Sequence, residues 1–215
     1  VSLIIRRMTL EDIPQVQGIE KEAFPTQWPP PSYKRELQNK LAHYLVMVEE
    51  SEEPSPVQKK NPGNIITRIW RRLFPPREKK AGSLPQKESY ILGMAGIWYM
   101  FDEAHITTLA VRGNKRLQGL GELLLIALID LSQELDARVV TLEVRVSNRV
   151  AQQLYLKYGF KGISIRRGYY AEDGEDALIM TTERITTARY QEHLHNLKLA
   201  HSAKWEVDYK EVRKF

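Results

Sequence analysis

Hydrophobic residues recur with two periods along the chain, and these periods predict its strands and helices. Runs rich in β-branched and aromatic residues predict strands at 3–8, 44–48, 90–100, 104–111, 139–144, 160–165 and 177–182. Apolar residues three or four positions apart predict helices at 9–23, 122–135 and 148–158, a short helix from Ser32, and a helical tail after Thr186. The order β-α-α-β, then β-β-α-β-α-β-β, predicts an α/β (α+β) fold, a mixed, mostly antiparallel sheet of about seven strands with helices on both faces.

Residues 49–88 interrupt this pattern with acids, prolines and lysines, and we interpret them as an insertion or linker. Within them, residues 64–74 place their apolar side chains on one helical stripe, with Arg68, Arg71 and Arg72 outside it. Three interpretations of this stripe remain open. It is a helix packed on the domain, an element that docks on a ribosome or membrane surface, or a disordered tether.

Composition narrows the class of protein. The 215 residues are 42% hydrophobic and 27% charged, as expected for a globular domain, and contain no cysteine. Disulfides, thiolate metal sites and a cysteine nucleophile are therefore excluded. No apolar run approaches the roughly 20 residues that cross a bilayer, and the first residues lack the order of a signal peptide, so we expect a cytoplasmic protein. The net charge of +5 is uneven, because residues 59–87 hold nine Lys or Arg and one acid.

A glycine-bearing loop between a predicted strand and helix carries the first chemical signal. It consists of Arg116, Leu117, Gln118, Gly119, Leu120 and Gly121. Glycine lets a backbone approach a ligand closely, and the amides of a helix N-terminus favour phosphate, so a pyrophosphate is the natural guest. The loop is neither a Walker loop nor a GxGxxG motif. Taken alone, its glycines are equally consistent with a tight turn.

In context, this loop resembles the [QR]-x-x-G-x-[GA] pattern of GNAT-superfamily acetyltransferases, since it follows Leu-Ala-Val and opens a Leu-rich helix. The segment 141–160 (TLEVRVSNRVAQQLYLKYGF) is similar to that of RimI-type ribosomal-protein-alanine N-acetyltransferases. So are the segments 165–170 (IRRGYY) and 175–180 (EDALIM). The resemblance covers roughly residues 3–48 and 89–184, and it implies a GNAT fold.

The resemblance also implies acetyl-CoA as cosubstrate and a set of residues that bind it. The loop amides would hold the pyrophosphate, and the backbone of Leu109, Ala110 and Val111 would pair with the pantetheine arm. A splayed pair of strands would then admit the thioester. Asn148 would contact the cosubstrate, and it also suits the N-cap of the helix that it precedes.

By the same resemblance, Glu143 is the general base and Tyr155 the general acid of a direct attack without an acyl-enzyme. The chemistry asks for both groups, because an ammonium must lose a proton before it attacks and a departing thiolate is stabilised by a phenol. Two structural alternatives stay open. Glu143 is an acid paired with Arg145 or another basic residue, and Tyr155 is a core aromatic.

The acceptor site follows from the resemblance as well. Tyr169 and Tyr170 would clamp the backbone of an incoming peptide, with Phe24, Pro25 and Trp28 on the opposite wall. Glu103 and His105 are candidates for binding the substrate amine. The expected substrate is the N-terminal α-amine of a protein, such as a ribosomal protein. The alternatives are a small amine, an internal lysine, or a non-catalytic scaffold that only binds acetyl-CoA.

The end of the chain departs from the family. We expect a GNAT domain over 1–185 and a helical tail over 186–215 that caps the sheet or mediates self-association. The tail histidines His193, His195 and His201 lack the spacing of a metal site, so we predict no metal. The sequence contains no recognisable nucleic-acid-binding fold.

Overall fold

The computed structural model describes residues 2–24, 31–50, 89–208 and 212–215. The predicted insertion at 49–88 lies outside the described residues, except that Glu49 and Glu50 end a strand. The basic stripe at 64–74 and two predicted wall residues, Pro25 and Trp28, also lie outside them.

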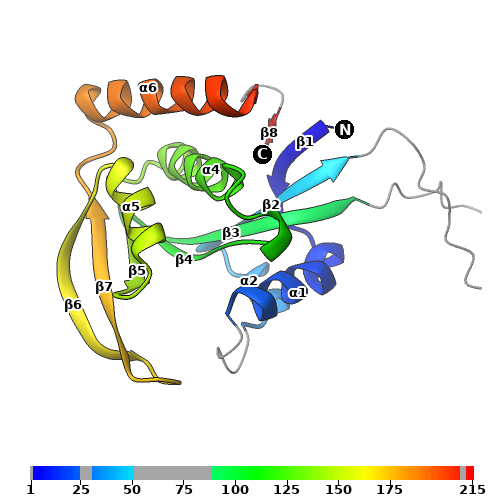
Figure 1. Cartoon of the computed structure of the whole chain (residues 1–215), viewed down its shortest axis with the longest axis horizontal. Helices are drawn as coiled ribbons and strands as arrows, with labels where there is room; N and C mark the ends of the chain where they lie inside the picture. Colours follow the sequence, from blue (N-terminus) through cyan, green and yellow to red (C-terminus); the bar gives the residue numbers. More distant parts are fainter. Residues whose placement is uncertain (1, 25–30, 51–88, 209–211) are drawn as a thin grey trace, which may run out of the picture.

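One mixed sheet of eight strands forms the centre of the molecule, in the order β6-β7-β5-β4-β3-β2-β1-β8 (Figure 1). Neighbouring strands are antiparallel except for β4 with β5 and β1 with β8. The predicted mixed, mostly antiparallel sheet is confirmed, and the two-residue β8 adds an eighth strand. The strands are β1 (Ser2–Arg7), β2 (Ala42–Glu50), β3 (Tyr90–Met100), β4 (Glu103–Val111), β5 (Val139–Arg145), β6 (Phe160–Tyr170), β7 (Glu175–Thr182) and β8 (Arg213–Lys214).

The helices cover both faces of the sheet, as predicted (Figure 1). Helices α1 and α2 lie on one face, α4 lies on the other, and α6 runs along the outer side of α4. The helices are η1 (Leu10–Asp12), α1 (Ile13–Ala23), α2 (Tyr33–Glu36), η2 (Gly113–Lys115), α4 (Leu120–Glu134), α5 (Arg149–Lys157) and α6 (Ala188–Trp205).

The core is divided by the sheet into two clusters. The smaller cluster packs Val16 and Ile19 of α1 against the sheet. The larger one is built on α4, in which all ten residues from Leu123 to Ser132 are buried. A surface helix would bury one stripe, but α4 lies between the sheet and α6 and is therefore apolar on most sides. Leu194 of α6 belongs to the same cluster.

The tail is attached to the domain at both of its ends. Near the start of α6, the buried Tyr190 donates a hydrogen bond from its hydroxyl to the Tyr158 carbonyl at 3.0 Å. Beyond its end, β8 pairs with β1, with Ile5 opposite Arg213. Arg213 also pairs with Asp130 of α4 at 3.3 Å. No helix within the described ranges is long and apolar enough to cross a membrane.

Candidate active site

Strands β4 and β5 run side by side for a short distance and then separate. Residues Glu103–Ile106 pair with Val139–Leu142, but both strands continue further. Thr107 is a bulge in the pairing of β4 with β3, and a bulge bends its strand. Beyond it, β4 keeps β3 on one side and has no partner strand on the other within the described part of the chain. The backbone of Leu109–Val111 can therefore pair with an extended ligand.

The predicted phosphate loop joins β4 to the N-terminus of α4. Leu117 and Gly119 adopt left-handed conformations, with φ of 60° and 76°, and Leu117 is 89% exposed. The first intrahelical bond runs from the Leu123 amide to the Gly119 carbonyl at 2.9 Å. The amides of the first turn, at 120–122, therefore have no partner within the helix, and together with the helix dipole they favour an anion.

The Glu143 carboxylate, only 9% exposed, lies between two basic side chains from different strands. Its Oε2 is 2.8 Å from His105 Nε2, and its Oε1 is 2.9 Å from Arg166 Nη1. The hydrogen bond from His105, with the positive charges of His105 and Arg166, holds the pKa of Glu143 below its ordinary value against the opposing effect of burial. Glu143 is thus ionised at neutral pH, a weak proton acceptor and a strong attractor for an ammonium group.

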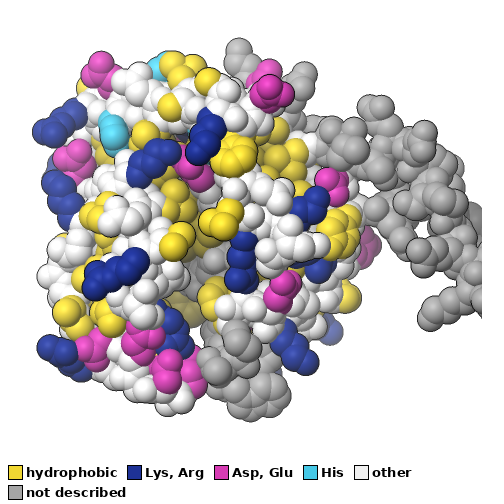
Figure 2. Space-filling model, in the orientation of Figure 1, with side chains coloured by type: hydrophobic (Ala, Val, Ile, Leu, Met, Phe, Trp, Pro, Cys, Tyr) yellow, Lys and Arg dark blue, Asp and Glu magenta, His cyan; other side chains and the backbone are white. Residues whose placement is uncertain are grey.

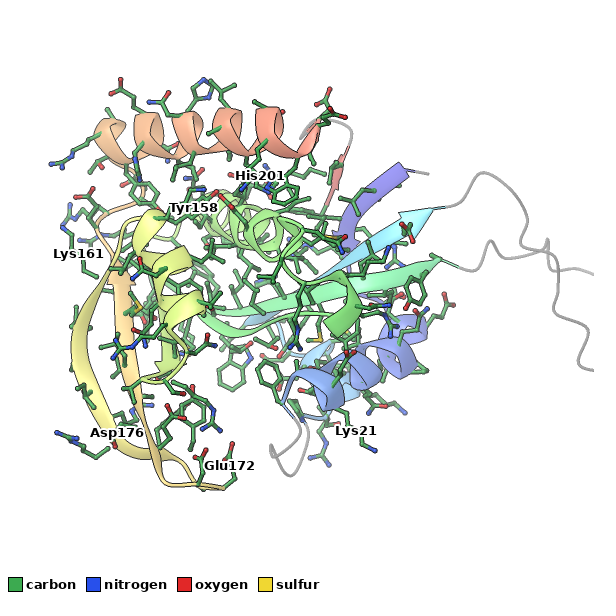
Figure 3. The ribbon with its side chains drawn as sticks, in the orientation of Figure 1. Lys21, Tyr158, Lys161, Glu172, Asp176 and His201 are labelled. Atoms are coloured by element: carbon green, nitrogen blue, oxygen red, sulfur yellow. The ribbon has the colours of Figure 1, made fainter. Side chains whose placement is uncertain are left out.

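Arg145 was the other candidate partner of Glu143, and the structure gives it different partners. It forms ion pairs with three acids near the β6–β7 turn, Glu172, Asp173 and Glu175. Glu172 lies near the tip of the β6–β7 hairpin, where Figure 3 shows it. Glu143 is therefore paired with basic residues, as the structural alternative proposed, and these residues are His105 and Arg166 in place of Arg145.

A line of polar groups runs from Glu143 to the surface. His105 Nδ1 lies 3.0 Å from the Thr141 hydroxyl oxygen, and Thr141 donates to Glu103 Oε1 at 2.5 Å. Because a carboxylate only accepts, this order is satisfied when Nδ1–H donates to Thr141 and Nε2–H donates to Glu143. Glu103 is exposed and engaged by Thr141, two groups away from Glu143.

Tyr169 and Tyr170 lie beside the groups that surround Glu143. Their ring centroids are 5.1 Å apart in an edge-to-face arrangement. The Arg166 guanidinium lies 5.1 Å from the Tyr169 centroid, and that of Arg145 lies 3.9 Å from the Tyr170 centroid. Burial is the main cause that raises the pKa of Tyr170 to about 12.

The strand that carries this tyrosine pair is longer than the sequence predicts. The pattern indicated an end at Ile165, but β6 continues to Tyr170. Asp176 of β7 supports the extension, because it accepts from the Gly168 amide at 2.9 Å and pairs with Arg167 at 2.6 Å. Both bonds join β6 to β7 across the hairpin, and the hydrophobic pattern within one strand does not predict contacts with another strand.

Tyr155 lies in the larger core cluster, with its ring 5.6 Å from that of Phe160. Burial raises its pKa to about 12. Its hydroxyl makes no hydrogen bond to any residue that the structure describes. Tyr155 therefore has the packing of a core aromatic and an uncommitted hydroxyl, so both interpretations of this residue remain compatible with the fold.

The remaining predicted residues have simpler surroundings. Asn148 is the N-cap of α5, and its side-chain oxygen accepts from the Ala151 amide at 3.1 Å. Phe24 follows α1 and is partly buried against the smaller core cluster. Arg166 was missed by the sequence analysis, although it stands within the IRRGYY segment that carried the resemblance. A basic residue preceding a tyrosine pair, two strands from β5, was the available signal.

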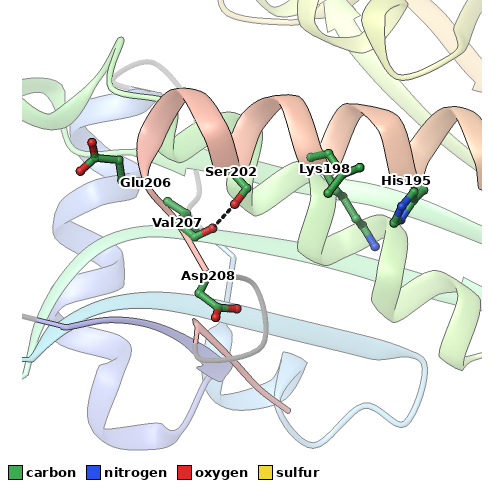
Figure 4. A pocket seen from close by; sticks show the side chains of 7 residues that line it. His195, Lys198, Ser202, Glu206, Val207 and Asp208 are labelled. Carbon is green, nitrogen blue, oxygen red and sulfur yellow. Dashed lines mark hydrogen bonds between the residues drawn. The ribbon is translucent and has the colours of Figure 1, made fainter.

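One hollow in the described part of the chain lies away from these groups and is lined by no predicted site residue. It has a volume of about 610 Å³ and is lined by α6 and the residues after it (Figure 4). Among the described residues, no group of three His, Asp or Glu side chains is arranged to hold a metal ion. On the face in Figure 2, Lys and Arg side chains are spread among acids and apolar groups and do not gather in one patch.

Comparisons with known proteins agree with this geometry. A family model for the acetyltransferase (GNAT) family matches residues 13–160. The "Putative [ribosomal protein bS18]-alanine N-acetyltransferase" of Bacillus subtilis (strain 168) is 37% identical over 177 residues, which is 82% of this chain and 92% of that protein. An N-alpha-acetyltransferase of Sulfurisphaera tokodaii is 32% identical over 82% of this chain and 90% of its own length.

A solved structure extends the likeness to three dimensions. The crystal structure of the ribosomal-protein-S18-alanine N-acetyltransferase from Escherichia coli has a TM-score of 0.61 and 26% identity, over 87% of this chain and 96% of that one. The parted strands, the glycine-bearing loop before α4 and the length of the matched segments are all explained by membership of one family. The chain belongs to the GNAT family of acetyltransferases, whose acyl donor is acetyl-CoA.

Proposed function

We propose that this chain transfers acetyl from acetyl-CoA to the N-terminal α-amine of a protein, of the ribosomal-protein-alanine type. The observation that carries the proposal is the ionised Glu143 held by His105 and Arg166 next to the parted strands, with the tyrosine pair alongside. Two relatives are named for the alanine of ribosomal protein S18, and this supports the same class of acceptor.

The ordinary pKa values of the two kinds of amine favour an α-amine over a lysine as acceptor. An α-amine has an ordinary pKa of about 7.7–8.0, whereas a lysine amine has one of about 10.4. At neutral pH the attacking, neutral form of the lysine is therefore rarer by roughly a few hundredfold. A carboxylate that is a weak base can complete the deprotonation of an α-amine, but it is poorly suited to a lysine.

The reaction then needs one base, one attack and one leaving group. Glu143 accepts a proton from the α-ammonium, directly or through a water molecule. The neutral nitrogen attacks the thioester carbonyl carbon, a C–N bond forms, and the C–S bond breaks. After the attack the nitrogen loses its second proton, the departing sulfur takes up one proton to leave as coenzyme A, and the product is the N-acetylated chain.

Tyr155 is the proposed donor to the departing sulfur. Because burial raises its pKa to about 12, the phenol keeps its proton over the working pH range. A protonated phenol donates a hydrogen bond to the developing thiolate, which stabilises the negative charge where it forms. The core packing of its ring against Phe160 limits the movement of the hydroxyl.

The tyrosine pair is the proposed clamp for the first residues of the acceptor. Tyr169 is 42% exposed, and its neighbour Arg166 also contacts Glu143. A peptide backbone bound by these rings would present its α-amine near the Glu143 carboxylate. An internal lysine would have to enter as a side chain with backbone on both sides, which this arrangement does not favour.

The test is acetyl-CoA turnover, followed by thiol release, on a matched panel of acceptors. The panel contains short peptides that differ only in their first residue, their N-terminally blocked lysine counterparts, and polyamines. Glu143→Gln and Tyr155→Phe keep the shape of each side chain and remove the proposed chemistry. We expect turnover on free α-amines, with alanine among the preferred first residues, and a loss of about 10²- to 10⁴-fold in kcat/KM for each variant.

Other outcomes would redirect the assignment. Turnover on blocked lysine peptides or polyamines with equal kcat/KM would contradict the N-terminal specificity. Coenzyme A binding without turnover on any amine would favour the scaffold alternative. Full activity in the Glu143→Gln variant would remove Glu143 from the mechanism while leaving the acetyltransferase assignment intact.

A further inference from the structure

The last turns of α6 lie against the phosphate loop. Figure 3 shows His201 on the side of α6 that faces α4, in the region of Tyr158. His201 is 2% exposed, and its Nε2 lies 3.0 Å from the Gly119 carbonyl oxygen. Since a carbonyl only accepts, Nε2–H is the donor in this bond. A helix of the tail thus donates a buried hydrogen bond to the loop.

Trp205, one helical turn further along α6, fills the space beside the same glycine. A Cβ on Gly119 would lie 2.5 Å from the indole Nε1 and 2.6 Å from Cε2. Trp205 therefore excludes any side chain from position 119. The ring centroids of His201 and Trp205 are 6.4 Å apart, so the two residues form one contact surface on the turn.

This contact lies beside the part of the loop in which the backbone has positive φ angles. Gly119 has a φ of 76°, and the exposed Leu117 pays a conformational cost at 60° because it is not a glycine. The loop start is held by α1, whose Glu22 carboxylate accepts from the Gly113 amide at 2.7 Å. His201 and Trp205 are the matching anchor at the loop end, adjacent to the amides at 120–122.

The anchor is itself fixed in place. Tyr190 secures the start of α6 to the Tyr158 carbonyl, and Ser202 donates to the Val207 carbonyl at 2.6 Å beyond its last turns. Val212 is buried in the larger core cluster, and β8 then joins the sheet. Movement of α6 away from the loop would therefore disrupt packing at both of its ends.

We propose that His201 and Trp205 are positioning residues for acetyl-CoA, which hold the Gly119 turn in the conformation that aims the α4 amides at the pyrophosphate. The tail helix is on this view a part of the cosubstrate site. The inference requires binding of acetyl-CoA but does not depend on the identity of the acceptor amine.

The experiment compares binding and turnover in four variants of the full chain. His201→Leu removes the donor, whereas His201→Gln keeps one; Trp205→Ala removes the ring, whereas Trp205→Phe keeps one. We expect the Kd for coenzyme A by calorimetry to rise about five- to tenfold in the first of each pair, the effect of about one hydrogen bond. The KM for acetyl-CoA should rise in parallel, with kcat at saturation almost unchanged, and the conservative variants should recover most of the loss.

The exposed His195 of the same helix provides the matched control, and His195→Leu should leave the Kd unchanged. Hydrogen exchange of the segment 112–122 in the free protein gives a second readout. The amides of a released loop should exchange faster, while the exchange of the core amides stays unchanged. A Kd within twofold of wild type in folded His201→Leu and Trp205→Ala, with unchanged loop exchange, would overturn the inference. Because the calorimetry needs no acceptor, it remains decisive even if the peptide panel shows no turnover.

Discussion

At the scale of single residues, the partners of a buried carboxylate decide the direction in which its pKa shifts. Glu143 has two basic partners, His105 and Arg166, and its pKa falls. Glu20 of α1 is also buried, but it accepts only the Tyr33 hydroxyl at 2.8 Å, on one oxygen. Its other oxygen has no partner among the described residues, and burial raises its pKa. The pKa values of these two glutamates are thus shifted in opposite directions.

The pairing of Glu143 predicts a shift in the pH dependence of activity. His105 lowers the pKa of Glu143, so His105→Ala should raise it and move the acidic limb of the kcat/KM profile to higher pH. Activity at acidic pH falls most, because the carboxylate then becomes protonated within the working range. The profile is measured on the preferred peptide, with the exposed His195→Ala as control. An unmoved acidic limb would mean that a different group sets it.

The isolation of Glu20 predicts a pH effect on stability instead. Its folded-state pKa is raised, so the stability it contributes is fully present below the unfolded pKa of about 4.3 and is lost as pH rises through the folded value. Glu20→Gln carries no such proton and should lose less stability between pH 4 and pH 8 than wild type. Urea unfolding at each pH checks this, with Glu11→Gln on the exposed surface as control. Parallel curves for wild type and Glu20→Gln would refute it.

At the scale of elements, the ends of helices carry both stability and binding. Helix α4 begins on a left-handed glycine and offers its first amides to an anion. Helix α5 begins on Asn148, which uses its side chain to cap the helix itself. The first amides of α4 therefore have no side-chain cap, whereas the Asn148 side chain occupies an amide at the start of α5.

Asn148 allows its two proposed roles to be separated. Asn148→Ala should cost about 1 kcal/mol in unfolding free energy through loss of the cap, whereas Asn148→Ser keeps a capping oxygen and should cost little. If the side chain also contacts acetyl-CoA, both variants weaken coenzyme A binding. Urea unfolding and calorimetry on the same samples distinguish the two roles. Equal stability in all three proteins would contradict the capping role.

Local sequence motifs predict single elements, but they do not predict contacts between distant elements. The helix start at Thr9 follows from a local motif, a capping threonine with an acid three residues further on. The structure confirms it, with the Asp12 carboxylate accepting from the Thr9 amide at 2.7 Å. The succession of strands along the chain and the position of the glycine-bearing loop before α4 were predictable for the same reason. The extension of β6, the Arg166 contact with Glu143 and the His201 bond to Gly119 were not. Each joins residues distant in the chain, and a local pattern carries no information on such pairs.

At the scale of the whole molecule, the two ends of the described chain lie together. Strand β8 runs beside β1 at one edge of the sheet, opposite the edge formed by β6 (Figure 1). Arg213 connects this edge to α4 through Asp130 and Glu134. Sheet edge, tail and the central helix are therefore one continuous packing unit.

Removal of residues 212–215 tests that unit. The buried Val212 and the ion pair to Asp130 are both lost, and we expect the unfolding free energy to fall by about 2–3 kcal/mol. Leu199→Ala, on the outer side of α6 and 56% exposed, should change it by less than about 0.5 kcal/mol. Denaturant midpoints measure both. A truncated protein as stable as wild type would show that β8 contributes nothing to the unit.

The pairing of Ile5 with Arg213 also bears on how the protein is made. More than two hundred residues separate these partners, and such non-local contacts form slowly. Helix α6, which touches Gly119, is translated shortly before β8. A nascent chain that already contains Glu143 and its strands would still lack the anchor of its phosphate loop. We therefore expect competence for acetyl-CoA to follow the docking of α6, during synthesis as well as in refolding.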